Sequence, residues 1–332
     1  MKVNALFYEA SSNDSVKCIL CPHNCVILSG KTGLCRTRMN VDGELFSLNY
    51  SDITSFGVDP IEKKPLFHFK PNDEVLSLGT WGCNFKCPFC QNFEISQEMP
   101  ESLKKINHKT LSTFLDKYNV KGIAFTYSEP SVWFEFILDT CRELKNNEKE
   151  YYTVMVTNGY INSKPLKLLL QHIDAMNIDV KSFNEEKHLK TLGGELKHIK
   201  KTVEIAYESK THLELTTLIV PGFNDDLEEL ENEFKWISGI SKDIPLHLSK
   251  YFPRYNYNNP ATDEGFLIEV YNTAKKYLDY VYIGNMWNKN YESTICPECG
   301  ELLIERKAYN VKIKNLNEYG GCENCKKQIV IK

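Results

Sequence analysis

The chain has 332 residues, with 40 lysines and arginines against 44 aspartates and glutamates, and 42% of its residues are hydrophobic. This length allows one large domain with additions, and the hydrophobic content allows a sizeable core. The near balance of charge leaves no global field that would attract nucleic acid or an anionic membrane. The N-terminus has no apolar signal core, and no run approaches the ~20 apolar residues of a spanning helix, so we expect a cytoplasmic protein.

Eleven of the twelve cysteines fall into three tight groups, and Cys141 stands alone. In a cytosolic chain this spacing indicates metal binding rather than disulfides. Cys141 falls in an expected helix among Ile137, Leu138 and Leu144, which is typical of a small core residue.

The first group contains four cysteines in a C-x2-C-x3-C-x9-C pattern, with Gly30 and Gly33 supplying tight turns. Its members are Cys18, Cys21, Cys25 and Cys35. Four thiolates complete a closed site, which would hold either a second, fully ligated iron–sulfur cluster that relays electrons or a structural zinc ion. His23 is a rival ligand, but a histidine inside such a loop is more often a bystander.

Residues 41–72 read as a connector, with a hairpin at Asp42–Gly43 followed by a proline-rich strap over 59–69. The prolines disfavour helix, so we expect an extended segment. Four charged residues of the strap either touch a ligand or are solvated. They are Asp59, Glu62, Lys63 and Lys64.

The second group, Cys83, Cys87 and Cys90, has the spacing C-x3-C-x2-C, and an apolar strand-like run, 75–78, precedes it. Three thiolates can hold a [4Fe–4S] cluster while one iron is left without a protein ligand. The amine and carboxylate of S-adenosylmethionine (SAM) can chelate that iron, and one electron from the cluster can then break the sulfonium bond. A structural zinc ion would need a fourth ligand, and no further cysteine or histidine lies nearby in the sequence.

From 75 to 285, short apolar runs alternate with amphipathic ones, which predicts parallel strands joined by helices in a partial (β/α) barrel. Strands are expected near 75–79, 122–126, 152–157, 174–180, 212–219, 245–249 and 280–284. Helices are expected near 109–118, 131–146, 163–171, 195–209, 225–238 and 262–278.

A distinctive segment follows each of the first six strands or closes it, and in such barrels the carboxyl ends of the strands form the site. The segments are the cysteine loop, 126–130, 157–160, 179–181, 220–225 and 247–251. Turn residues are common for conformational reasons alone, so the joint pattern carries the prediction.

The third group, Cys296, Cys299, Cys322 and Cys325, consists of two CxxC knuckles around β-rich runs. This pattern predicts a zinc ribbon, although a single rubredoxin-like iron would use the same ligands.

The cysteine loop resembles that of the radical SAM superfamily. Nearly the whole chain resembles the superfamily's relatives of pyruvate formate-lyase activating enzyme, and specifically the AmmeMemoRadiSam system branch. The resemblance rests on the cysteine-rich head and tail, 59–66, 79–92, 127–130, 157–160 and 177–181.

The resemblance implies three regions: a cysteine-rich N-terminal part and connector over 1–72, a radical SAM core, a partial (β/α)6 TIM-type barrel, over 73–285, and a zinc-ribbon-like tail over 286–332. It also implies a SAM-chelated [4Fe–4S] cluster at the three cysteines of the second group. The superfamily's Gly-Gly-Glu-Pro segment receives the SAM amino group, and here Tyr127 and Ser128 replace the glycine pair before Glu129. By the same resemblance Asn158, Asp179 and Lys181 approach the ribose or carboxylate of SAM, Val220 lies against the adenine, and His247 and Tyr251 face the substrate.

The expected activity is reductive cleavage of SAM to methionine and a 5′-deoxyadenosyl radical, which abstracts hydrogen from a substrate that the sequence does not identify. The electron donor would be flavodoxin or ferredoxin, and the resemblance points to an association with Memo-like and AMMECR-type proteins. One alternative is an activase that acts on a backbone glycine of a partner enzyme. A more distant one is a non-catalytic metal scaffold that binds nucleic acid through lysines of the tail, although the slightly acidic chain disfavours it.

Overall fold

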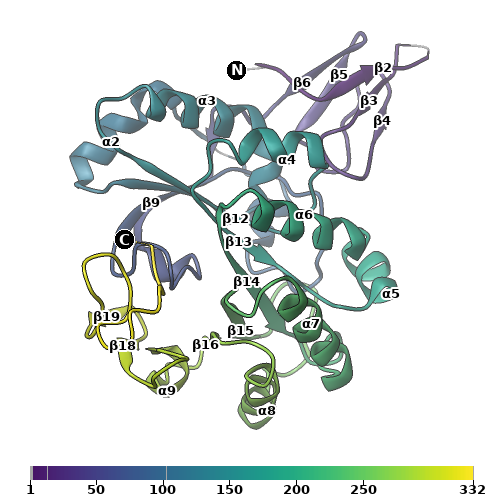
Figure 1. Ribbon diagram of the computed structural model, residues 1–332. Helices are drawn as coiled ribbons and strands as arrows, with labels where there is room; N and C mark the ends of the chain where they lie inside the picture. The colour runs from purple at the N-terminus through teal and green to yellow at the C-terminus, as the bar shows by residue number, and fades with distance from the viewer. Residues whose placement is uncertain (1–2, 13, 102, 332) are drawn as a thin grey trace.

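The computed structural model describes residues 3–12, 14–101 and 103–331. Its centre is one eight-stranded sheet, with the N-terminal strands and the C-terminal tail at opposite ends of the molecule (Figure 1).

Seven parallel strands make up most of the central sheet, and all seven had been expected from the sequence. They are β9 (Glu74–Gly79), β11 (Gly122–Phe125), β12 (Tyr152–Thr157), β13 (Ala175–Asp179), β14 (His212–Ile219), β15 (Leu246–Lys250) and β16 (Val281–Gly284). They lie side by side in chain order, and β8 (Ser55–Pro60) pairs antiparallel to β9 at one edge. The sheet is open between β8 and β16, which fits a partial (β/α) barrel with one parallel strand more than six.

The six expected helices are also present, mostly on the outer side of the strands (Figure 1). They are α2 (Leu111–Tyr118), α3 (Phe134–Lys145), α4 (Ser163–Leu169), α6 (Leu196–Glu208), α7 (Leu227–Ile240) and α8 (Glu264–Ala274). Shorter turns of helix are α1 (Phe93–Ser96), α5 (Glu185–Lys187), α9 (Lys289–Glu292), η1 (Ile61–Lys63), η2 (His108–Thr110), η3 (Pro130–Trp133) and η4 (His188–Leu192).

Side-chain caps fix where two of these helices begin. The carboxylates of Asp226 and Asp263 accept hydrogen bonds from backbone N–H groups of the first turns of α7 and α8. The long helix α3 buries Cys141 on its inner stripe, so the prediction that this cysteine belongs to the core is confirmed.

The N-terminal region consists of small antiparallel sheets packed on the barrel. Their strands are β1 (Val3–Asn4), β2 (Tyr8–Ala10), β3 (Val16–Cys18), β4 (Val26–Ile27), β5 (Arg38–Val41), β6 (Glu44–Ser47), β7 (Asp52–Ile53) and β10 (Lys104–Lys105). The hairpin expected at Asp42–Gly43 joins β5 to β6, and both turn residues have positive φ, 51° and 88°. Glycine adopts this conformation readily, which explains Gly43 at the second position.

The strap over 59–69 differs from the extended, solvated segment that was one of the expectations. After β8 it makes the 3-10 turn η1, and its apolar side chains pack against the inner face of the barrel strands. Asp59, Glu62 and Lys64 are buried, while Lys63 alone of the four charged residues is exposed. The prediction of a solvated strap is therefore wrong for three of the four: Asp59 and Lys64 pair with each other at 2.8 Å, and Arg306 of the tail lies 3.7 Å from Glu62.

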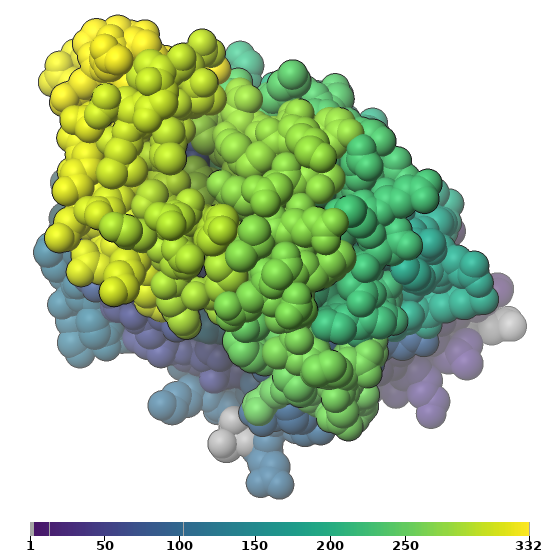
Figure 2. Space-filling model, turned by 90° about the horizontal axis from the view of Figure 1, so that it is seen from below, coloured from purple at the N-terminus to yellow at the C-terminus, as the bar shows by residue number. Residues whose placement is uncertain are grey.

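The tail contains the strands β17 (Thr294–Ile295), β18 (Leu302–Lys307) and β19 (Asn310–Ile313). Its buried residues form one cluster with Phe67 of the strap and with Tyr280 and Tyr282 beside and in β16. Figure 2 shows the tail, in yellow, lying directly against the last part of the barrel, in light green. No helix among the described residues is both long and apolar enough to cross a lipid bilayer.

Candidate active site

The cysteine loop of residues 80–92 follows the carboxyl end of β9 and lies against the N-terminal region. Gly82 has φ +93°, and a Cβ atom added there would lie 2.3 Å from the Thr37 side chain and 2.8 Å from the Cys35 carbonyl oxygen. Only glycine fits this close approach at this backbone conformation. The loop that carries the second cysteine group is therefore packed directly on the loop that carries the first.

Hydrogen bonds hold the cysteine loop in place. Cys83 Sγ accepts a hydrogen bond from the Phe85 backbone N–H at 3.3 Å, and the side-chain amide of Asn158 lies 3.8 Å from the same sulfur. Cys90 Sγ lies 3.1 Å from the hydroxyl of Ser96 in α1. Cys87 is buried, and this burial raises the pKa of its thiol to about 12, although the positive charge of Lys181 opposes the shift.

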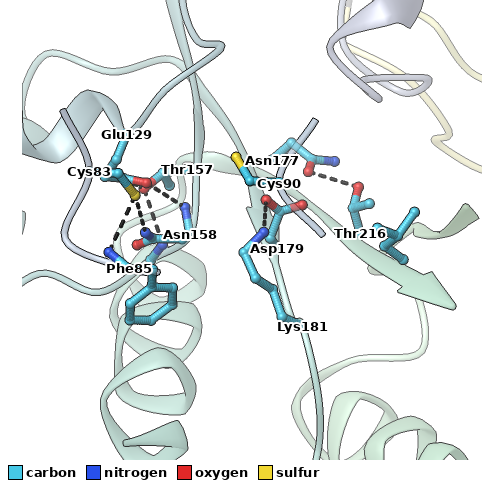
Figure 3. Close-up of polar contacts among 12 residues, drawn as sticks. Cys83, Phe85, Cys90, Glu129, Thr157, Asn158, Asn177, Asp179, Lys181 and Thr216 are labelled. Atoms are coloured by element: carbon cyan, nitrogen blue, oxygen red, sulfur yellow. Dashed lines mark hydrogen bonds and ion pairs between the residues drawn. The ribbon is translucent and has the colours of Figure 1, made fainter. Parts of the chain in front are cut away.

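Glu129 links the segments that follow β11 and β12, as Figure 3 shows. Its carboxylate accepts hydrogen bonds from the Thr157 hydroxyl at 2.6 Å and the Asn158 backbone N–H at 2.8 Å. It also accepts the Ser131 N–H at the start of η3. Burial raises the pKa of Glu129, and these three donors oppose the shift. The carboxylate therefore orients Asn158, whose amide in turn donates to Asn84 Oδ1 at 2.8 Å.

Asp179 and Lys181, after β13, form an ion pair of 2.8 Å on the other side of the cysteine loop (Figure 3). Burial alone would lower the pKa of Lys181, but the charge and hydrogen bond of Asp179 together with the charges of Cys87 and Cys90 outweigh it and raise that pKa. Thr216 of β14 donates to Asn177 Oδ1 at 2.8 Å (Figure 3). The expected segments of β9, β11, β12 and β13 thus come together at one end of the sheet.

Tyr127 and Ser128 stand where the superfamily has two glycines. Tyr127 has φ +75°, a strained value for a residue with a side chain, and its hydroxyl donates to Asp59 Oδ2 at 2.8 Å. The Ser128 hydroxyl donates to the Thr80 carbonyl at the start of the cysteine loop, at 2.7 Å. The departure from glycine therefore ties this segment to both the strap and the cysteine loop.

Three of the residues expected to face SAM or the substrate are buried in the structure. Val220 is fully buried in the core, so its side chain offers no face to an adenine; in that segment Pro221, Gly222 and Asp225 reach the surface. His247 is buried, and its Nε2 lies 2.7 Å from the carboxylate of Glu214. Glu214 therefore holds the ring of His247, a residue that the resemblance placed on the substrate side. Tyr251 is also buried, and its hydroxyl donates to the Tyr257 carbonyl at 2.6 Å.

A cavity of about 100 Å³ lies beside His247, at the carboxyl ends of β15 and β16. The strap, the barrel and the tail all contribute to its lining, which includes Pro65, Phe67, Ser249, Trp287 and Tyr309. A larger open hollow of about 1110 Å³ lies at the amino ends of the strands and has no cysteine in its lining. The smaller cavity is the one on the side where barrel enzymes of this type bind ligands.

The four tail cysteines are close-packed. Cys296 Sγ lies 3.4 Å from Cys325 Sγ, and Cys299 Sγ lies 3.6 Å from Cys322 Sγ. Four thiolates about 2.3 Å from one tetrahedral ion would lie about 3.8 Å apart, so this group has the dimensions of a single-ion site.

Sequence reasoning missed the buried charges that tie the regions together. In the barrel interior Glu214 accepts hydrogen bonds from the backbone N–H groups of Phe67 and His68. Burial raises its pKa, but the hydrogen bonds and charges of His212 and His247 outweigh burial and hold that pKa well below the usual value. Arg306 of the tail donates to the Phe67 carbonyl and lies 3.7 Å from the Glu62 carboxylate. Acidic and basic residues inside apolar runs, as at Glu214 and Arg306, were the available signal.

The donor set after β9 fits the group that its spacing suggests. Three soft thiol ligands stand in one loop. Among the described residues, none of these three sulfur atoms belongs to a close group of three or more metal-binding atoms. A single metal ion would draw its ligands together, whereas a polynuclear iron–sulfur cluster keeps them apart.

Comparison with known proteins agrees with this chemistry. Residues 78–237 match the Radical SAM superfamily. An uncharacterised protein of Methanocaldococcus jannaschii is 39% identical over 98% of both chains. A protein of the same organism that carries the name of a glycyl-radical enzyme activating enzyme is 28% identical over 64% of this chain and 82% of its own length. A pyruvate formate-lyase-activating enzyme of Staphylococcus epidermidis is 27% identical over 49% of this chain and 68% of its own length.

The crystal structure of a radical SAM methyltransferase from Sphaerobacter thermophilus superposes with a TM-score of 0.51 at 12% identity, over 65% of this chain and 67% of that chain, which supports the fold alone. Membership of the superfamily implies a [4Fe–4S] cluster and SAM as cofactors, and it makes the protein an enzyme rather than a non-catalytic scaffold. This chain therefore belongs to the Radical SAM superfamily, among the relatives of its activating enzymes.

Proposed function

We propose that the protein cleaves SAM reductively and uses the product radical to abstract a hydrogen atom from a substrate. Cys83, Cys87 and Cys90 would hold the [4Fe–4S] cluster through their thiolates. When bound, the cluster supplies one electron that splits SAM into methionine and a 5′-deoxyadenosyl radical. The chain's own residues bind SAM, orient it and exclude water.

The observation that carries this proposal is the connection from Glu129 through Asn158 to Cys83. Glu129 fixes the Asn158 backbone at 2.8 Å, and the Asn158 amide reaches Cys83 Sγ at 3.8 Å and Asn84 Oδ1 at 2.8 Å. Two segments from different strands are thus held against the cysteine loop by a satisfied, buried network. A preorganised network of this kind holds reacting groups in the geometry that the reaction requires.

The SAM contacts follow from this arrangement. The backbone around Tyr127, Ser128 and Glu129 borders the cysteine loop and would receive the amino group of SAM. The amide of Asn158, together with Asp179 and Lys181, would bind its ribose and carboxylate. The ion pair of Asp179 and Lys181 offers one acceptor and one donor at the partly exposed rim of the site.

The substrate would enter through the cavity beside His247. His247 borders this cavity while Glu214 holds its ring, so its role there is to shape the cavity and not to contact SAM. Trp287 and Tyr309, both about half exposed, pack edge to face at its rim with ring centroids 5.8 Å apart. An aromatic rim of this kind suits a substrate with an apolar or planar part.

The outer regions would serve the core. The tail over 286–332 would be a zinc ribbon, because its four thiols have the dimensions of a tetrahedral site. The division into a head over 1–72, a core over 73–285 and this tail, the cytoplasmic location, and the association with Memo-like and AMMECR-type proteins remain predictions. Activases of the superfamily generally take electrons from flavodoxin or ferredoxin, and we expect such a donor here.

Anaerobic EPR of the dithionite-reduced protein, recorded with and without SAM, tests the proposal. We expect a [4Fe–4S]+ signal whose g-values move when SAM is added, together with release of 5′-deoxyadenosine. A protein that binds only zinc, or a cluster signal that SAM leaves unchanged, would contradict it.

A second candidate is a glycyl-radical activase, which the names of two relatives favour. In that case the abstracted hydrogen would come from a backbone glycine of a partner enzyme. Incubation with the candidate partner, SAM and a reductant should then give the EPR doublet of a glycyl radical. A small-molecule substrate would give deuterium transfer into 5′-deoxyadenosine without any protein radical.

A further inference from the structure

The four cysteines of the N-terminal region line one small, largely apolar cavity between two loops of that region and the turn η3 that precedes α3. Its lining contains Cys18, Cys21, Cys25 and Cys35. We propose that these thiolates hold a second, fully ligated [4Fe–4S] cluster, which passes single electrons to the site at Cys83, Cys87 and Cys90. The relay role rests on the proposed function; the cluster itself does not.

The spacing of the four thiols distinguishes a cluster from a zinc ion. Among the described residues, only the tail cysteines bring three or more metal-binding atoms within 4.8 Å of one another. The N-terminal cysteines share a cavity yet stay outside that limit, whereas a zinc ion would need its thiolates about 3.8 Å apart. A cluster of four irons separates its ligands and fills the space between them. The tail group, in the same molecule, shows what a single-ion site looks like in this chain.

Arg38 supplies an independent observation. It is buried and lines the cavity, and its Nε–H has no hydrogen-bond partner. The other guanidinium nitrogens are engaged, Nη1 by the Leu6 carbonyl at 3.1 Å and Nη2 by Glu135 at 2.8 Å. A buried N–H without an acceptor is costly, and thiolate or sulfide sulfur of a bound cluster would accept it. The guanidinium would also balance part of the negative charge of four thiolates.

The N-terminal loop touches the second cysteine loop at two points. His23, two residues after Cys21, donates through Nε2–H to the carbonyl oxygen of Asn84 at 2.8 Å, and Asn84 is the neighbour of Cys83. At the second point the Cys35 carbonyl lies so close to Gly82 that no side chain fits there. The two loops that carry the cysteine groups are therefore in direct contact, as an electron relay between them requires.

The proposed step is a single electron transfer. A low-potential one-electron donor, such as reduced flavodoxin or ferredoxin, is oxidised by one electron at the N-terminal site. That electron then leaves for the site at Cys83, Cys87 and Cys90, so the N-terminal site returns to its starting state. No bond forms or breaks, and no proton moves.

The first experiment uses the full chain with the triple substitution C83A/C87A/C90A, reconstituted anaerobically with iron and sulfide. It should retain about four iron atoms per chain and a [4Fe–4S]+ EPR signal that SAM does not change. Loss of all iron, or zinc in place of iron beyond that bound by the tail, would overturn the proposal. Because this variant lacks the SAM site, its result stands whether or not the wild type cleaves SAM.

The second experiment uses the double substitution C18A/C21A, with C141A as the matched control for loss of a buried thiol. With reduced flavodoxin as donor, wild type and C141A should develop the SAM-sensitive EPR signal. C18A/C21A should not develop it within the same time. Dithionite, a small reductant, should still produce the signal in C18A/C21A, which shows that the second site is intact. Equal rates with flavodoxin would overturn the relay while leaving the cluster.

The substitution Arg38→Lys, added to C83A/C87A/C90A, tests whether the unpartnered Nε–H of Arg38 binds the cluster. Lysine keeps the charge but not this donor, and the loss of a hydrogen bond to sulfur should shift the midpoint potential of the N-terminal cluster to a lower value. An unchanged potential would show that Arg38 does not contact the cluster.

Discussion

Arg38 and Glu135 form a buried ion pair across 97 residues of sequence, with Nη2 of the arginine 2.8 Å from both carboxylate oxygens. The pair joins β5 of the N-terminal region to α3 of the barrel. Glu135 also accepts the Leu6 backbone N–H at 2.8 Å, so its carboxylate orders two segments of the head at once. The position of the N-terminal cysteines relative to the barrel depends on this contact.

Glu135→Gln should therefore lower the free energy of unfolding by about 3 kcal/mol, because it leaves the charge of Arg38 buried without a counter-ion. Urea unfolding followed by circular dichroism measures the loss. Glu186→Gln is the control, since its pair with Lys190 is exposed to solvent and should contribute little to stability. Equal effects of the two substitutions would show that the buried pair does not anchor the head.

Cys87→Ala should abolish both the SAM-sensitive EPR signal and the release of 5′-deoxyadenosine, because two thiolates do not hold the cluster stably. Cys141→Ala also removes a buried thiol but lies in the core of α3, so it should cost about 1 kcal/mol of stability and keep full activity. SAM cleavage at the wild-type rate by the Cys87→Ala protein would refute the assignment of the site.

Asn158→Ala should reduce kcat/KM for SAM by about tenfold, which corresponds to about 1.4 kcal/mol of binding in the transition state. The loss should be mainly in KM, because the amide supports the SAM side of the cysteine loop. Iron content should stay at the wild-type level. Asn146→Ala, at the exposed C-terminal end of α3, is the control and should leave both parameters unchanged. Unaltered kinetics in Asn158→Ala would remove this residue from the SAM site.

His68 should make stability depend on pH. Burial lowers the pKa of His68 to about 3, and its ring lies 2.9 Å from the Ile329 carbonyl and 2.6 Å from the Tyr282 hydroxyl. In the unfolded chain the histidine takes up a proton below its usual pKa of about 6.5, whereas the folded protein resists it until about pH 3. The contribution of neutral His68 to the free energy of unfolding is therefore fully present above pH 6.5. It decreases as the pH is lowered, by about 2 kcal/mol at pH 5.

His68→Gln is the matched variant, since an amide can keep both hydrogen bonds but does not titrate. The difference in melting temperature between wild type and His68→Gln should narrow or reverse in favour of the variant as the pH falls from 7 to 5. Other acid-sensitive groups are common to both proteins and cancel. A constant difference over this range would show that His68 does not titrate as described.

Removal of metal from the tail should release that region without unfolding the barrel. Cys299→Ser should lose the single metal ion and expose the segment after 294 to limited proteolysis, because the ion supplies much of the folding energy of so small a unit. Glu298→Gln, between two ligands but without a thiol, should keep the metal. An unchanged digestion pattern in Cys299→Ser would show that the strands β17–β19 hold the tail without metal.

The sequence alone determined the order and kind of the main elements. Periodicity is local, so the strands at 152–157 and 212–219 and the long helix at 131–146 could be read from the alternation of apolar and polar residues. The spacing of Cys83, Cys87 and Cys90 is local too, and it predicted the chemistry before any geometry was known. The structure differs from these predictions mainly in the ends of the helices and strands, which lie a few residues from the predicted positions.

Only the tertiary structure decided what happens to the charged and polar residues between these elements. Asp59 and Lys64 look solvated in the sequence, yet Lys64 Nζ lies 2.8 Å from Asp59 within the barrel, beside Tyr127 from a segment 68 residues away. His247 was expected to face the substrate, and only the fold shows that Glu214 on the neighbouring strand engages its ring. Asp59 and Lys64 are only five residues apart in sequence. Their burial nevertheless depends on a strap that packs against the barrel strands and on Tyr127 from a distant segment, and no local pattern shows either. The separation of the four N-terminal thiols has the same origin, because it is set by how two loops pack and not by the number of residues between cysteines.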